Sequence, residues 1–113
     1  MRAFFAVSHL ERARAFYDLL LGVPGEIRGA RLAYVVEDFK LDFYVLTDEQ
    51  SREFQLSPGS SQGCGLCLSF SGSLEALEAA GGCWLRPMGP TEWGAQVAHL
   101  QDPFGFRWEL VRA

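Results

Sequence analysis

Hydrophobic side chains near the start of the chain follow the period of a helix. Four of them recur three or four residues apart: Leu10, Ala13, Phe16 and Leu20. This spacing places them on one face of an α-helix. Just before them, Ser8-His9-Leu10-Glu11 matches a capping box, in which the Ser8 hydroxyl accepts a hydrogen bond from the Glu11 N–H. Glycine at position 22 and proline at position 24 supply a stop, so we predict a helix over residues 9–21.

Short apolar runs around this helix predict strands. One run covers 2–7, and three follow the helix at 25–28, 31–37 and 41–47, with turn residues at 29 and 38–40. The same order then returns, with a strand at 64–70, a helix at 74–80, and strands at 83–86, 95–101 and 106–112. The pattern therefore predicts one βαβββ unit used twice.

The stretch between the two units is polar and has no apolar period. Residues 48–63 are rich in Ser, Gly and Gln, which is typical of a linker. A chain of 113 residues suits one domain with one core. We expect a single α+β domain, in which unit one spans 1–47, the linker 48–63 and unit two 64–113.

Composition excludes several classes of protein. With 49% hydrophobic and 21% charged residues the chain is not disordered. The net charge is −4 and no run of Lys or Arg exists, which argues against nucleic-acid partners. No apolar run is long enough to span a membrane, and the apolar start is too short for a secretion signal. Three cysteines, an odd number, fit a reducing compartment, so we expect a cytoplasmic protein.

Two segments resemble a known superfamily. Val7-Ser8-His9-Leu10-Glu11-Arg12-Ala13-Arg14-Ala15-Phe16-Tyr17, followed by Leu20-Leu21-Gly22, is similar to the opening of the vicinal oxygen chelate superfamily, which includes glyoxalase I, bleomycin-resistance proteins and extradiol dioxygenases. Asp102-Pro103-Phe104-Gly105-Phe106-Arg107-Trp108-Glu109-Leu110 resembles its closing hairpin, which carries an inward Glu. The resemblance implies two βαβββ units forming a cupped, mainly antiparallel eight-stranded sheet. It also implies a ligand in the concave face and a homodimer.

Enzymes of this superfamily place up to four metal ligands in the cup. Transferred to this sequence, the first-strand position falls on Arg2 and the fourth-strand position near Tyr44, with Asp42 as a substitute. The fifth-strand position falls on residues 65–66, with Cys64 nearby, and the last on Glu109. Arginine offers no acceptor and repels a cation, so only Glu109 keeps an obvious ligand. A divalent ion needs three or more donors; we therefore expect no metal cofactor and no catalytic residues.

The leading hypothesis is metal-independent binding of a small planar or cationic molecule, as the resemblance to bleomycin-resistance proteins implies. Its ligand-binding residues are Arg2, Tyr44, Trp93 and Glu109. Trp93 lies in a turn-rich loop where strand periodicity does not bury it, which suits either an aromatic at the rim of the cup or one that closes the edge of the core. Glu109 is interpreted either as facing the ligand or as an ion-pair partner of Arg2.

Two other functions stay open. One is a metal-dependent lyase, isomerase or dioxygenase that uses Asp42, Cys64 and Glu109. The other is a non-catalytic interaction subunit whose cup is filled by side chains. Cys64 and Cys67 form a C-x-x-C pair, but strand residues three apart face opposite sides, so small apolar strand positions are the preferred interpretation. His99 is interpreted as a satisfied sheet histidine.

Overall fold

The computed structural model describes residues 2–59 and 65–112. The first half contains four strands and two helices: β1 (Arg2–Ala6), α1 (Leu10–Leu21), β2 (Glu26–Arg28), β3 (Arg31–Val36), β4 (Phe39–Tyr44) and α2 (Asp48–Phe54). The second half contains one helix and four strands: β5 (Leu66–Ser69), α3 (Leu74–Ala79), β6 (Cys83–Pro90), β7 (Gln96–Gln101) and β8 (Arg107–Arg112). The predicted βαβββ order is therefore present in both halves.

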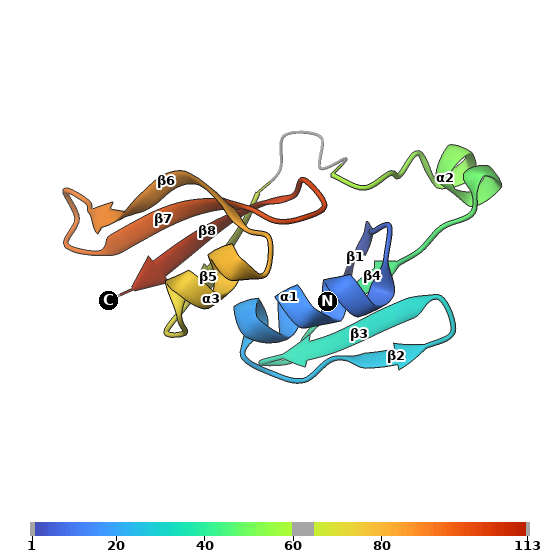
Figure 1. Cartoon of the computed structure of the whole chain (residues 1–113), viewed down its shortest axis with the longest axis horizontal. Coiled ribbons are helices and arrows are strands. Elements are labelled where there is room, and N and C mark those ends of the chain that lie inside the picture. The colour runs from blue at the N-terminus through green and yellow to red at the C-terminus, as the bar shows by residue number, and fades with distance from the viewer. Residues whose placement is uncertain (1, 60–64, 113) are drawn as a thin grey trace.

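The two halves also share one strand topology. The first sheet has the order β1-β4-β3-β2 and the second the order β5-β8-β7-β6. In each sheet the first pair is parallel and the other two pairs are antiparallel. The chain is thus α+β, and its eight described strands are divided between two four-stranded sheets. The sheets lie toward opposite ends of the long axis, and α1 and α3 meet between them (Figure 1).

Local details of the first unit differ from the sequence predictions. The N-cap of α1 is His9, whose Nδ1 accepts a hydrogen bond from the Arg12 N–H at 3.2 Å. The predicted Ser8 capping box is wrong because the helix begins one residue later than that box requires. The β3–β4 turn lies at Glu37 and Asp38, both with positive φ, rather than at 38–40. Such a two-residue turn matches the twist of a hairpin.

The predicted linker contains a helix. The cap of α2 is a true capping box, because the Thr47 hydroxyl accepts from the Gln50 N–H at 3.1 Å and the Gln50 side chain accepts from the Thr47 N–H at 3.0 Å. No residue of α2 is buried. Without a buried face the helix leaves no apolar period in the sequence, which is why the pattern gave no sign of it.

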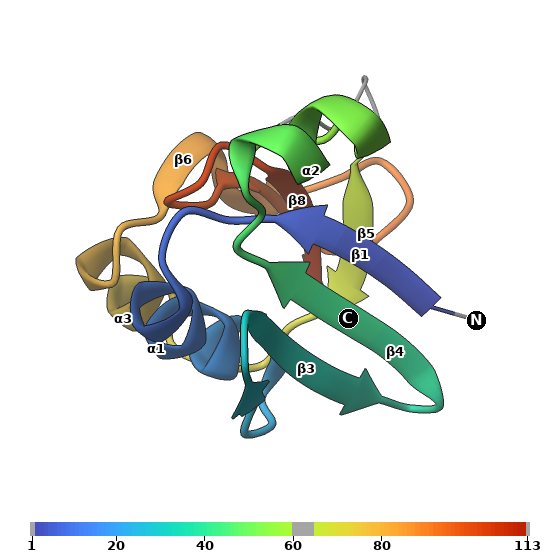
Figure 2. The same cartoon turned by 90° about the vertical axis from the view of Figure 1, so that its right-hand side faces the viewer.

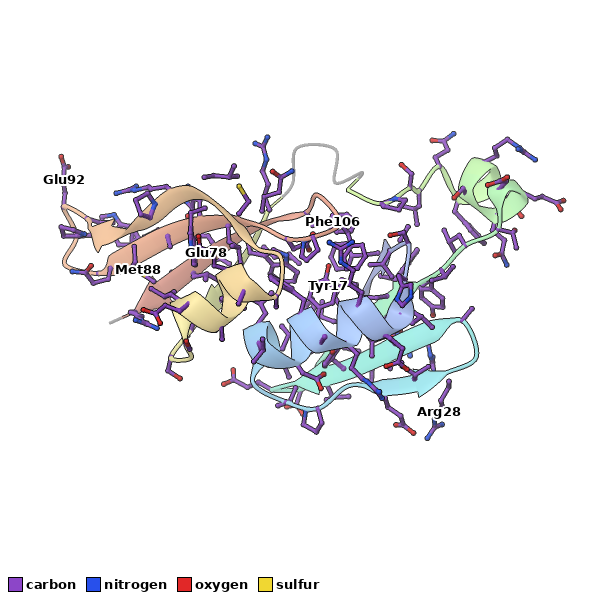
Figure 3. All side chains as sticks on the ribbon, in the orientation of Figure 1. Tyr17, Arg28, Glu78, Met88, Glu92 and Phe106 are labelled. Atoms are coloured by element: carbon purple, nitrogen blue, oxygen red, sulfur yellow. The ribbon has the colours of Figure 1, made fainter. Side chains whose placement is uncertain are left out.

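The two units share one aromatic core. The ring of Tyr17 on α1 stacks on Phe43 of the first sheet at a centroid distance of 4.0 Å. It also lies 6.0 Å from the Trp108 ring of the second sheet. Phe5 meets Phe106 edge to face at 5.1 Å. Figure 3 shows Tyr17 and Phe106 in the middle of the molecule, where the units meet.

A buried carboxylate lies in this core. Asp102, in the turn between β7 and β8, accepts hydrogen bonds through Oδ2 from the Tyr17 hydroxyl at 2.5 Å and from Trp108 Nε1 at 2.9 Å. Its Oδ1 accepts from the backbone N–H groups of Phe104 at 2.9 Å and Phe106 at 3.0 Å. Burial raises the pKa of Asp102, and these donors oppose that rise. Tyr17 belongs to unit one, so the carboxylate joins the two units.

Among residues 2–59 and 65–112, no helix is both long and apolar enough to span a membrane.

Replacing Asp102 with Asn is expected to destabilise the fold. The Asn oxygen can keep the two backbone donors, but the new NH₂ group faces the Trp108 N–H, so one buried donor loses its acceptor. We expect a loss of about 2–3 kcal/mol in the free energy of unfolding. Urea unfolding followed by circular dichroism measures it.

Tyr17→Phe is the control variant against which the stability loss of Asp102→Asn is compared. It removes one of the four donors to Asp102 and keeps the stacked ring, so its cost should be about 1 kcal/mol. An Asp102→Asn protein as stable as the wild type would show that the carboxylate does not hold the units together.

Candidate functional site

One row of polar side chains crosses the open face of the second sheet, the face turned away from α3. Cys67 on β5 lies opposite Glu109 on β8, Glu109 lies opposite His99 on β7, and His99 lies opposite Arg86 on β6. Residues directly opposite in neighbouring strands point to the same face. Because the neighbouring Trp108 is buried in the core, Glu109 points outward. We call these four side chains the Glu109 row.

Glu109 is the centre of the row. Its Oε2 lies 3.0 Å from His99 Nε2, and its Oε1 accepts a hydrogen bond from the Cys67 thiol at 3.4 Å. The side chains of Glu109 and His99 are 39% and 43% exposed. The carboxylate is therefore fixed in orientation by two neighbours and still open to a further donor or cation.

The same contacts set the charges in the row. The hydrogen bonds from His99 and from Cys67 lower the pKa of the Glu109 carboxyl below its usual 4.5. Burial, with the neighbouring Glu109, raises the pKa of the Cys67 thiol. At neutral pH the row therefore presents an anionic carboxylate next to a protonated thiol, which acts as a hydrogen-bond donor.

A cavity of about 450 Å³ adjoins the row. It lies between the two units and runs along β5, four consecutive residues of which line it. Its walls are mainly apolar, and its lining residues are Leu21, Val36, Glu37, Phe39, Leu41, Leu66, Cys67, Leu68, Ser69 and Trp108. Figure 2 shows β5 behind β1 and β4 of the first sheet. Cys67 belongs both to the cavity and to the row, so the two meet at β5, whereas Trp108 lines the cavity from the face of β8 opposite to Glu109.

The first sheet carries a carboxylate of its own on β4, and it is covered. Asp42 on β4 lies opposite Phe4 on β1 and Ala33 on β3, just as Glu109 lies opposite Cys67 and His99. Asp42 is only 2% exposed, and its Oδ2 lies 2.9 Å from Arg2 Nε. That oxygen has no hydrogen bond, so the contact with Arg2 is an ion pair without hydrogen-bond alignment.

The four predicted ligand-binding residues are not brought together. The predicted pairing of Arg2 with Glu109 is wrong, because Arg2 pairs with Asp42 on the first sheet while Glu109 pairs with His99 on the second. Tyr44 is on the first sheet, where its ring meets Phe4 edge to face.

Trp93 lies at the tip of the β6–β7 hairpin and is 67% exposed. Figure 3 shows its neighbour Glu92 at the far end of the second sheet. Trp93 is not among the residues that line the cavity. Cys64, which was considered as a metal ligand, lies outside the described residues.

Two residues of the site were not predicted. The sequence favours a small apolar strand position for Cys67, whose thiol instead contacts Glu109. It favours a satisfied sheet histidine for His99, and the partner that satisfies it is also Glu109. The contact between Cys67 and Glu109 joins residues 42 positions apart through the parallel pairing of β5 with β8. The only signal in the sequence was the repeat itself, which gives β5 and β8 the pairing of β1 and β4.

The residues of the described chain do not fit the metal that the resemblance implies for the enzymes. Within 2–59 and 65–112 there is no group of three or more His, Cys, Asp or Glu side chains that could hold a metal ion. Asp42 is occupied by Arg2, and the oxygens of Glu109 are shared between His99 and Cys67. Phe4 and Ala33, which flank Asp42, offer no side-chain donor atoms.

Comparison with known proteins identifies the fold. No protein-family model and no curated protein matches the chain. A glyoxalase/bleomycin resistance protein from Albidiferax ferrireducens T118 is 23% identical with a TM-score of 0.74, over 99% of this chain and 96% of that one. A glyoxalase-related enzyme from Fulvimarina pelagi is 23% identical with a TM-score of 0.76, and the match covers 97% of this chain and 84% of that enzyme. A hypothetical protein, SA1046 from S. aureus, is 15% identical with a TM-score of 0.79, and the match covers 100% of this chain and 92% of that protein. The chain therefore has the fold of the glyoxalase and bleomycin-resistance structures.

Proposed function

We propose that this protein binds a small planar or cationic molecule, without a metal ion, at the Glu109 row and the adjoining cavity. The observation that carries the proposal is an ionised, partly exposed carboxylate beside a mainly apolar cavity of about 450 Å³. Cavities of roughly 300–1,000 Å³ with apolar walls and a few placed polar groups are typical of small-molecule sites.

Each part of the site has a distinct task in this proposal. Glu109 attracts the cation or accepts the hydrogen bond of the ligand, because its contacts keep it negatively charged. The apolar walls of the cavity, among them Leu66, Leu68 and Trp108, cover a flat ring system. Cys67 lies where cavity and row meet, and its thiol, whose single S–H is donated to Glu109, keeps that carboxylate in place.

The donor set supports binding rather than metal chemistry. The carboxylates of both sheets already have partners, Arg2 for Asp42 and His99 with Cys67 for Glu109. A ligand cation could share Glu109 with its two hydrogen-bonded neighbours, whereas at Asp42 it would have to displace the fixed charge of Arg2. The proposal therefore rests on Glu109. Arg2 and Tyr44 would act only where the ligand extends to the first sheet.

The charge of Glu109 can be tested directly. Its carboxyl pKa, followed by carbon NMR during an acid titration, should lie below 4.5 in the wild type. His99→Leu removes the larger cause of the shift, so the pKa should rise toward 4.5, and Cys67→Ala should raise it by less. A carboxyl that titrates at the same pH in the wild type and in His99→Leu would contradict the assigned contacts.

Ligand binding can be tested by calorimetry with bleomycin and a set of planar organic cations as probes. Glu109→Gln keeps the shape of the side chain but removes its charge, so the affinity for a bound cation should fall by about 1–3 kcal/mol. Glu92→Gln is the matched control, because it removes the same charge from the exposed hairpin tip (Figure 3) and should leave affinity unchanged. An equal loss in both variants would mean that only net charge matters. Stoichiometric metal in protein purified without an affinity tag would refute metal-independent binding.

The sequence-based prediction that Trp93 contacts the ligand is tested separately, because the hairpin tip that carries Trp93 does not line the cavity. Because the side chain is 67% exposed, Trp93→Ala should leave the melting temperature unchanged. If Trp93 stacks on the ligand, the affinity of a binding probe should fall by about 1–3 kcal/mol. Unchanged affinity together with unchanged stability would remove Trp93 from the site.

A further inference from the structure

The cavity between the units has a carboxylate in its wall that does not belong to the Glu109 row. Glu37, in the β3–β4 turn of the first unit, lines the cavity together with its neighbours Val36 and Phe39. It is the single charged residue among the described residues of that wall. Another part of the wall is β5 of the second unit, and Figure 2 shows the hairpin of β3 and β4 in front of that strand. The turn therefore brings one negative charge to a mainly apolar cavity.

The Glu37 side chain is available to a ligand. The residue is exposed, and within residues 2–59 and 65–112 its carboxylate has no ion pair and no hydrogen bond. Three other carboxylates of the first unit, those of Glu11, Glu26 and Asp42, are paired with arginine. A carboxylate without a protein partner, next to apolar walls, can pair with a cation that the ligand supplies.

The turn itself does not account for a glutamate at this position. Glu37 has a φ of 49° and Asp38 a φ of 69°, so both lie in the left-handed region. Two-residue hairpin turns with positive φ at both positions prefer Asn, Asp or Gly. Asp38 follows this preference and Glu37 departs from it. A residue that breaks a local rule where it lines a cavity indicates a task other than forming the turn.

We propose that Glu37 holds the positive group of an organic ammonium ion whose flat apolar body lies in the cavity. Leu41, Leu68 and Trp108 supply apolar wall for that body. Phe39, two residues after Glu37, adds an aromatic ring to the wall, and such rings attract cations. The same carboxylate disfavours anions, so it selects among ligands by charge. The inference rests on the proposed function for the cavity as a ligand site, but it does not depend on Glu109.

Two probes of nearly equal shape test this assignment: 2-naphthylmethylammonium, which is positively charged, and 2-naphthylmethanol, which is neutral. Their binding is followed by NMR of the leucine methyl groups, and the methyl signals of Leu41 and Leu68 should shift saturably. The ammonium ion should bind about tenfold more tightly than the alcohol, because only the ion can pair with Glu37. In Glu37→Gln this advantage should disappear, while the affinity for the alcohol should stay the same.

Asp38→Asn is the matched control. Asp38 is the next residue of the same turn, is also exposed and also has a positive φ, but it does not line the cavity. Its variant should therefore bind the ammonium ion as the wild type does. Equal losses in Glu37→Gln and Asp38→Asn would overturn the inference, since they would reflect net charge alone. Unchanged binding in Glu37→Gln, or no methyl shift with either probe, would overturn it as well.

Glu109→Gln separates this inference from the proposed function. A loss of ammonium binding in Glu37→Gln but not in Glu109→Gln would support the inference and reject the role proposed for Glu109. A loss in Glu109→Gln alone would keep the proposed function and overturn the inference. A loss in each variant would support both.

Glu37→Gly gives a second measurement that separates binding from the turn. Glycine adopts positive φ without the steric cost that a side chain carries, so the melting temperature should not fall. The affinity for the ammonium ion should nevertheless drop as far as in Glu37→Gln. A glycine variant that binds the ion as tightly as the wild type would show that Glu37 serves only the turn, and would refute the inference.

Discussion

The buried carboxylate of Asp102 is the constraint on which the rest of the structure depends. A carboxylate at this depth is tolerated only when its oxygens are satisfied, and here four donors converge on it. One donor comes from α1 of unit one and the others come from the closing hairpin of unit two. The Trp108 N–H fixes the inner face of β8, and the next residue, Glu109, must then face outward. The hydrogen bonds of Asp102 therefore both join the two units and direct the Glu109 side chain outward.

The two units share one topology, but a carboxylate on β4 and a carboxylate on β8 have opposite surroundings. Asp42 is covered and paired with a permanent cation, whereas Glu109 is open and held by a histidine and a thiol. The arginine of an ion pair is hard to displace from its carboxylate because the guanidinium keeps its charge at every physiological pH. A carboxylate that is held only by hydrogen bonds, like that of Glu109, can accept an additional donor at a smaller cost in free energy than one paired with arginine. Of these two carboxylates, that of the second sheet is therefore the one open to a further donor or cation.

Elements with a local cause could be predicted from the sequence, and contacts that depend on strand register could not. The period of Leu10, Ala13 and Phe16 is enough to predict α1, and the resemblance of the segment that begins at Asp102 to the superfamily implies the closing hairpin. The contact of Cys67 with Glu109 depends on a parallel pairing between distant segments, which no local pattern encodes. The expected pairing of Arg2 with Glu109 assumed one continuous concave face, whereas the residues belong to two separate sheets.

The position of the cavity along β5 has a consequence for the ligand. β5 ends the strand order of its sheet, so within the described residues its outer edge pairs with no other strand. Backbone N–H and C=O groups along such an edge seek hydrogen-bond partners. The cavity lies against four consecutive β5 residues, which brings part of this edge to its wall. For the proposed function, a flat molecule with donors and acceptors on its rim would pair with that edge while its faces contact apolar side chains. Together with the anionic Glu109 on the neighbouring strand, the strand edge is a reason to propose a planar cation rather than an aliphatic one.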